Sequence, residues 1–272
     1  MTVPARKFGY VPDPLDKRDR TFSALLRTAG VRGAPQESVN FRSEVVSILD
    51  QGDLASCTAQ SVMGALRLKH ALDGVVAPLL GNRLHAYWGT RSYIGTIDWD
   101  SGGHIRDTFK FINGFGYMPE LNTVHGHDLK SFKQAPSMVE QQQMFDQRDK
   151  SDGQVEYYRI YERGEDRVNA IKRALSNRMP VVFGTQTTQK FLDYRQGYLS
   201  LPGDRERFLG GHAMYACGYT KDGLVCPNSW DDDYGDNGYI RLSWDYIKWE
   251  ETQDIWAIEK APYFSSHVEA AA

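Results

Sequence analysis

The chain has 272 residues, a formal net charge of -3, and apolar and charged fractions of 41% and 25%. This composition is ordinary for a globular protein of one large domain or two lobes, and the chain is long enough to bury a sizeable core. The near-balanced charge gives no hint of a nucleic-acid partner, which normally needs a basic stripe, or of an anionic membrane surface. The sequence also lacks a run of about 20 apolar residues for a membrane span. Near its beginning it lacks the roughly 7–15 apolar residues of a secretory signal.

Helical patterns dominate the first half of the chain. Residues 1–40 are rich in proline and charge, and they predict an extended arm over the surface. Apolar residues at helical spacing predict helices over 57–72, 105–112 and 166–176, and glycine or proline follows the first two. Residues 121–152 are rich in Gln, Lys and Asp, which predicts a polar surface excursion.

The second half of the chain is typical of short strands. Strands are predicted at 180–183, 211–219, 224–228, 238–242 and 255–258, the second and third forming a hairpin. This segregation of helices and strands predicts an α+β protein with two lobes. The expected division is an arm over 1–40, a helical lobe mainly over 41–150, a β lobe mainly over 151–260, and a tail over 261–272.

Cys57 stands at the start of the first predicted helix, after the plausible N-cap residue Ser56. The free N–H groups and the dipole of a helix start favour negative charge there. They lower the pKa of a thiol and favour the reactive thiolate. Taken alone, the commoner fate of a free cysteine is that of a small buried hydrophobic residue. A nucleophile at this position also needs a basic partner.

His212 and Asn228 supply the candidate partners. They lie 16 positions apart around the predicted turn, and directly opposed residues of a hairpin share one face. A simple hairpin centred on Thr220 therefore puts the Asn228 amide beside the imidazole. The amide oxygen can then fix the histidine tautomer and leave the other ring nitrogen for Cys57. A lone histidine on a strand is more often structural. The interpretation of His212 as a base therefore depends on its occurrence together with Asn228 and Cys57.

Cys217 and Cys226 are the other two cysteines of the chain. The same register sets Cys217 opposite Gly223 and Cys226 opposite Met214, so their sulfurs face opposite ways and we expect both to be reduced. An odd and sparse set of cysteines fits a reducing compartment. We therefore expect a cytoplasmic location.

Several sequence blocks resemble those of the papain family of cysteine peptidases, in the family's order Cys, His, Asn. The blocks are Gln51-Gly52 with Ser56-Cys57, Gly211-His212-Ala213 with Gly218-Tyr219, Asn228-Ser229-Trp230 with Gly238-Tyr239, and Ser101-Gly102-Gly103. The arm from Gly9 to Asp19 is similar to the start of bacterial and phage members. Together these blocks span roughly 8–260.

The resemblance implies a papain-like two-lobed fold, with a helical lobe, a β-barrel-like lobe and the active-site cleft between them. It implies that Cys57 attacks the peptide carbonyl, that His212 is its base, that Asn228 orients His212, and that Gln51 is a donor of the oxyanion hole. It also assigns substrate contacts to Gly102, Gly103 and Gly211, and a shielding role at the cleft to Trp230. The implied partner is a protein or peptide substrate, and the chemistry needs neither a metal nor an organic cofactor.

The sequence departs from the family pattern at several positions. Leu54 replaces a cysteine that usually forms a disulfide near the cleft, and Thr58 replaces an aromatic residue. Asp231 and Tyr234 replace the usual Gly and Trp. The long inhibitory segment common in the family is not expected before Cys57, and we hypothesise that the arm over 1–40 covers the cleft instead.

Two rival functions stay open at this point. One is another Cys/His acyl-transfer enzyme, such as a peptidoglycan amidase or a transglutaminase. The other is a catalytically silent papain-like binding or structural protein, for example of a phage particle, which would make the location phage- or virion-associated. A metal at His125 and His127, or calcium at Asp231–Asp233, is disfavoured against a solvated loop and an exposed turn.

Overall fold

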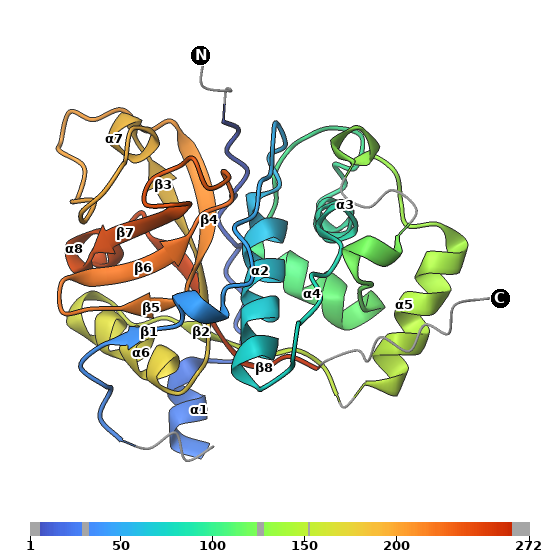
Figure 1. Cartoon of the computed structure of the whole chain (residues 1–272), viewed down its shortest axis with the longest axis horizontal. Helices are drawn as coiled ribbons and strands as arrows, with labels where there is room; N and C mark the ends of the chain where they lie inside the picture. Colours follow the sequence, from blue (N-terminus) through green and yellow to red (C-terminus); the bar gives the residue numbers. More distant parts are fainter. Residues whose placement is uncertain (1–5, 29–32, 124–127, 152, 263–272) are drawn as a thin grey trace.

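The structure is a computed structural model that describes residues 6–28, 33–123, 128–151 and 153–262. Helices make up one half of the molecule and strands the other (Figure 1). The first described residues, dark blue in Figure 1, run between the two halves. Among the described residues, no helix has both the length and the apolar character that crossing a membrane requires.

The helical half is built around α2 (Cys57–Leu72), whose bounds are those predicted. Nearly all of its side chains are buried, so it is a central helix and not an amphipathic surface helix. It packs against β4 (Gly210–Ala216), α3 (Arg83–Tyr93) and α4 (Ile105–Phe115). Gly116 ends α4 with a φ of 82° that suits glycine.

Helices α3 and α5 (Met138–Lys150) of the helical half were not among the predicted helices. The predicted polar excursion over 121–152 contains α5, which Ser137 and Glu140 start with a capping box. Helix α3 follows Asn82, whose side chain accepts a hydrogen bond from the His85 N–H. Its buried face includes arginine and histidine side chains, so the apolar period was weak.

The β half contains two antiparallel sheets. One has the order β2-β8-β3-β4 and the other β1-β5-β6-β7. The strands are β1 (Val39–Asn40), β2 (Glu156–Ile160), β3 (Val181–Thr187), β4 (Gly210–Ala216), β5 (Gly218–Tyr219), β6 (Gly223–Pro227), β7 (Tyr239–Ser243) and β8 (Gln253–Lys260). The remaining helices are α1 (Phe22–Thr28), α6 (Gly164–Ser176), α7 (Gln189–Leu192) and α8 (Trp244–Lys248), with short 3-10 turns at 42–44, 120–122 and 129–131.

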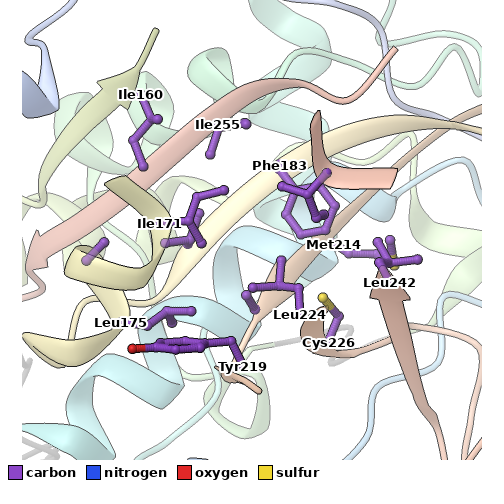
Figure 2. Packing of buried hydrophobic residues seen from close by; sticks show 14 of the residues in the cluster. Ile160, Ile171, Leu175, Phe183, Met214, Tyr219, Leu224, Cys226, Leu242 and Ile255 are labelled. Atoms are coloured by element: carbon purple, nitrogen blue, oxygen red, sulfur yellow. The ribbon is translucent and has the colours of Figure 1, made fainter. Parts of the chain in front are cut away.

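Two large apolar clusters hold the strands of the β half in place. One lies inside the β half, where Phe183, Met214, Leu224 and Leu242 pack together (Figure 2). The other joins α2 and α4 to the faces of β3, β4 and β8. Burial of this second cluster fixes β4 against the start of α2, and the helical and β halves therefore share a core.

The predicted hairpin register is wrong. Strand β5 pairs with β6 through Gly218 with Val225 and Tyr219 with Leu224, which sets the turn later than a centre at Thr220. The physical reason is that the chain changes sheets at Cys217. Strand β4, before it, pairs with β3 in one sheet, whereas β5, after it, pairs with β6 in the other sheet. His212 and Asn228 are therefore not partners in one ladder.

Cys217 and Cys226 are both free, as expected. The reason differs from the predicted one, because the register of β5 and β6 differs. The Cys226 side chain lies in the cluster inside the β half, and that of Cys217 lies in the cluster shared with the helices. The two thiols thus belong to different cores.

The predicted extended arm is extended only in part. Residues 6–20 form no helix, but α1 and β1 follow within the range assigned to the arm. The arm also does not run over the surface near Gly9 and Tyr10, which are buried. It lies instead between the helical and β halves (Figure 1).

Candidate active site

Cys57 is the first residue of α2 and has no solvent exposure. Ser56 occupies the N-cap position, but its side chain makes no cap hydrogen bond, contrary to expectation. Its hydroxyl accepts a hydrogen bond from Gln60 Nε2 at 3.1 Å. The helix N–H groups beside Cys57 are therefore not capped by Ser56.

His212 lies on β4, and Asn228 follows the end of β6. His212 Nε2 donates to Asn228 Oδ1 at 2.7 Å, and the Ser229 N–H donates to the same oxygen at 2.9 Å. Two donors on one atom fix it as the amide oxygen, so the proton of the imidazole sits on Nε2. His212 Nδ1 is buried and has no hydrogen-bond partner among the described residues. The lone pair of this nitrogen is therefore available to accept a proton.

Aromatic rings enclose the imidazole. Trp230 lies against it with ring centroids 4.6 Å apart, and Phe191 meets it edge-on at 5.8 Å. Burial lowers the pKa of His212 to about 4, and the hydrogen bond to Asn228 opposes this shift only in part. The imidazole is therefore neutral near pH 7.

The thiol of Cys57 is likewise neutral. Burial raises its pKa to about 11, although the backbone N–H groups of Ala213 and Gly9 lie close enough to the sulfur to oppose the shift. A neutral thiol is a resting form of the residue, because the thiolate is the nucleophilic form.

Gln51 is fully buried in the segment that precedes α2. Its Oε1 accepts a hydrogen bond from the Ser229 hydroxyl at 2.7 Å. Its Nε2 donates to Leu54 O at 2.7 Å and to Lys7 O at 3.0 Å. The side chain is thus held rigidly, with one amide proton pointing to a carbonyl of the arm.

The predicted substrate-contacting glycines also meet the arm. The Gly103 N–H donates to Gly9 O at 2.8 Å, and Gly211 O accepts from the Tyr10 N–H at 2.9 Å. Gly102 has a φ of 74°, and a Cβ there would lie 2.1 Å from Gly9 O. Only glycine fits the backbone at this close approach.

The structure thus brings the predicted site residues to one place. Contacts with residues 6–11 are made by Cys57, Gln51, Gly102, Gly103, Gly211 and Trp230. The Cys57 sulfur also lies near the N–H of Ala213, the neighbour of His212 on β4, and His212 in turn is hydrogen-bonded to Asn228. Ser229 and Phe191 belong to the site but were not singled out in the sequence. Ser229 stands within the Asn-Ser-Trp block, whereas nothing in the local pattern marks Phe191.

The alternative cation sites gain no support. Among the described residues, no three His, Cys, Asp or Glu side chains are grouped as metal ligands. His125 and His127 lie outside the described residues. Asp231–Asp233 form an exposed turn, as expected.

Comparison with known proteins places this geometry in a family. The papain family cysteine protease profile matches residues 100–256, which include His212 and Asn228. The chain therefore belongs to the papain family of cysteine proteases. It is also 28% identical to an uncharacterized peptidase C1-like protein of Acanthamoeba polyphaga mimivirus, over 94% of this chain and 88% of that protein.

Solved structures share the fold. Xylellain, a cysteine protease from Xylella fastidiosa, superposes with a TM-score of 0.76 at 24% identity, covering 94% of this chain and 98% of its own. Bromelain from Ananas comosus, solved in complex with the E64 inhibitor, gives 0.58 at 18% identity, covering 82% and 98%. The α+β papain-like fold is thereby confirmed.

Proposed function

We propose that the protein is a cysteine endopeptidase that hydrolyses peptide bonds through a thioester on Cys57. The observation that carries the proposal is the pairing of His212 Nε2 with Asn228 Oδ1 at 2.7 Å, which leaves Nδ1 as a buried base without a hydrogen-bond partner in the part of the chain that the structure describes. A base held in one tautomer beside a thiol is what activation of a cysteine nucleophile needs.

In the first step, His212 Nδ1 takes the thiol proton and the sulfur bonds to the substrate carbonyl carbon. The resulting oxyanion is met by Gln51 Nε2 and by the backbone N–H of Cys57 at the start of α2. The tetrahedral intermediate collapses with cleavage of the C–N bond, and His212 gives its proton to the leaving amine. Water, activated by His212, then hydrolyses the thioester and regenerates the thiol.

The surrounding residues support these roles. Ser229 holds Gln51 through Oε1, and it also donates its backbone N–H to Asn228. One residue therefore connects the proposed oxyanion donor with the residue that orients the base. Trp230 and Phe191 exclude water from the imidazole, which strengthens the hydrogen bond to Asn228.

The test is covalent labelling with the epoxide E64, followed by peptide mapping, together with hydrolysis of a fluorogenic peptide library. We expect one adduct, on Cys57, and peptide cleavage that the adduct abolishes. A peptidoglycan amidase would instead release peptide from cell-wall fragments and leave the library intact. Labelling without any hydrolysis would favour a catalytically silent protein.

A further inference from the structure

Asp100 lies in the loop between α3 and α4, and its carboxylate reaches the segment that precedes α2. We infer that Asp100 is a positioning residue, which fixes the proposed oxyanion donor Gln51 relative to the Gly102–Gly103 segment that would hold the backbone of a substrate. This inference rests on the proposed function, and it adds to that function a residue that lies outside the motif blocks.

The peptide group between Leu54 and Ala55 is held from both of its sides. Its carbonyl oxygen, Leu54 O, accepts a hydrogen bond from Gln51 Nε2 at 2.7 Å. Its N–H, which is that of Ala55, donates to Asp100 Oδ1 at 2.9 Å. Because a peptide group is planar and rigid, the two bonds fix one unit. Asp100 therefore acts on the direction of the Gln51 amide through a single peptide group.

This tie is made without a covalent bond. Leu54 stands where a cysteine usually forms a disulfide near the cleft, and all three cysteines of the chain are free. The Asp100 carboxylate instead reaches Ala55 from 45 positions away in the sequence. A tie of this kind depends on one acceptor oxygen, which a single substitution can remove.

The same oxygen of Asp100 also binds the phenol of Tyr87, a residue of α3 without solvent exposure. The Tyr87 hydroxyl donates to Asp100 Oδ1 at 2.6 Å and accepts from the Gly102 N–H at 3.0 Å. A phenol can both donate and accept, and here it does both. The Gly103 N–H, next in the chain, donates to Gly9 O at 2.8 Å, so this segment already binds extended backbone. Asp100 thus connects the Gln51 side of the site with its peptide-binding side.

Arg91, one turn after Tyr87 on α3, holds the loop that carries Asp100. Its guanidinium donates to Ile97 O at 2.7 Å and to Trp99 O at 3.1 Å. It also lies over the Tyr87 ring, 4.2 Å from the ring centroid. Arg91 is fully buried, and a buried charge that loses its partners is costly. The loop and the phenol therefore share one rigid support.

The second oxygen of the carboxylate, Asp100 Oδ2, forms an ion pair with Lys7 at 2.8 Å. The Lys7 side chain is half-exposed, and such a pair contributes little. The role of Asp100 therefore depends on the acceptor oxygen Oδ1 and not on the negative charge. Asparagine also has a side-chain acceptor oxygen, so it should replace the aspartate.

The consequence for catalysis follows from this geometry. The Gln51 amide must meet the carbonyl oxygen of a substrate whose backbone lies on Gly103, so the two segments have to keep a fixed separation. A misplacement of about 1 Å can cost about 10²-fold in rate. Without the acceptor at position 100, the Ala55 N–H and the Tyr87 hydroxyl lose the atom that joins them.

The first test is the hydrolysis of fluorogenic peptides by Asp100→Ala in the full chain. We expect kcat to fall at least about ten-fold, because the oxyanion donor loses its alignment. Asp100→Asn should stay within about three-fold of wild type, because it keeps the acceptor. Asp98→Ala is the matched control, since Asp98 is exposed in the same loop. Wild-type kcat in Asp100→Ala, or no rescue by Asp100→Asn, would overturn the inference.

A double-mutant cycle with Gln51→Ala separates positioning from a general loss of structure. If Asp100 acts through Gln51, adding Asp100→Ala to Gln51→Ala should lower kcat by less than about two-fold further. An equal loss in both backgrounds would overturn the positioning role. If Asp100→Ala does not fold, as judged by circular dichroism, Asp100→Ser takes its place, because its side chain is too short to reach both donors. The same expectations then apply.

Hydrogen exchange of the backbone amides, followed by NMR, tests the tie without any activity. Asp100→Ala should speed exchange at the Ala55 N–H at least about ten-fold, and Tyr87→Phe should do so at the Gly102 N–H, because each amide loses its acceptor. These changes in a protein that hydrolyses no peptide would uphold the tie and refute the proposed endopeptidase. Unchanged exchange at both amides would overturn the tie, whatever the activity.

Discussion

The two sides of the candidate site are built in different ways. On the β side, His212, Asn228 and Trp230 are held by core packing and by hydrogen bonds between neighbouring segments. On the helix side, Cys57 and Gln51 complete their contacts with Gly9 and Lys7. The proposed base is thus held by the fold, whereas the proposed nucleophile and the proposed oxyanion donor contact residues 6–11. Activity is expected to depend on that difference.

The largest effect should come from the nucleophile itself. In the full chain, Cys57→Ser should lower kcat at least about 10³-fold, because an alcohol is a far weaker nucleophile here and the base is matched to a thiol. Peptide hydrolysis measured by fluorescence tests this, with Cys217→Ala as a control thiol substitution away from the proposed machinery. Hydrolysis retained in Cys57→Ser would show that Cys57 is not the nucleophile.

Gln51→Ala removes the proposed oxyanion donor on the helix side. It should lower kcat by about 10²–10³-fold with little change in KM, because the lost bond is made mainly in the transition state. The exposed Gln142→Ala is the control. A rise in KM at constant kcat would show that Gln51 only binds substrate.

The β side makes a prediction for stability against pH. His212 has its pKa lowered from 6.5 to about 4 by burial, so the unfolded chain binds the proton more readily. The stabilisation that comes from keeping His212 neutral is fully present above pH 6.5 and is lost as the pH falls toward 4. The free energy of unfolding should then fall by about 3 kcal/mol. Urea unfolding at pH 7.5 and 4.5 should show this loss, and His212→Asn should show a smaller one. Equal losses in both proteins would contradict the buried neutral imidazole.

Of the four effects predicted in this comparison, that of Asn228→Ala should be the smallest. The imidazole remains packed between Trp230 and Phe191, so only the hydrogen bond that fixes its tautomer is lost. We expect kcat to fall about ten-fold, corresponding to one hydrogen bond. Steady-state kinetics of the variant in the full chain measures this. A fall as large as that of Cys57→Ser would mean that packing alone does not hold the base.

Sequence patterns predicted much of this fold where buried residues recur with a clear apolar period. The helix over 57–72 has apolar residues at helical spacing without proline, and α2 has the same bounds. Helix α3 was missed because arginine and histidine on its buried face weaken the apolar period. The register of β5 and β6 was wrong because a change of sheets at Cys217 leaves no local signal.

The candidate site residues could be named from the sequence, but the contacts that residues 6–11 make with them could not. The motif blocks name Cys57, His212 and Asn228, and the structure puts the last two in hydrogen-bond contact. The hypothesis that the arm covers the cleft had no support from local pattern. It gains support only from long-range pairs, such as Gly9 with Gly103 and Tyr10 with Asp254, which a single sequence does not encode locally.

The pH dependence of Cys57 alkylation tests the central claim most directly. With residues 6–11 in contact with the thiol, burial raises the pKa of Cys57 to about 11, so wild-type alkylation by iodoacetamide should increase with pH up to that range. In Gly9→Ala a Cβ would lie 1.8 Å from the carbonyl oxygen of Ala55, so residues 6–11 must shift at the thiol. The midpoint should then move down by several pH units. A wild-type midpoint below pH 7, coinciding with that of Gly9→Ala, would contradict the account.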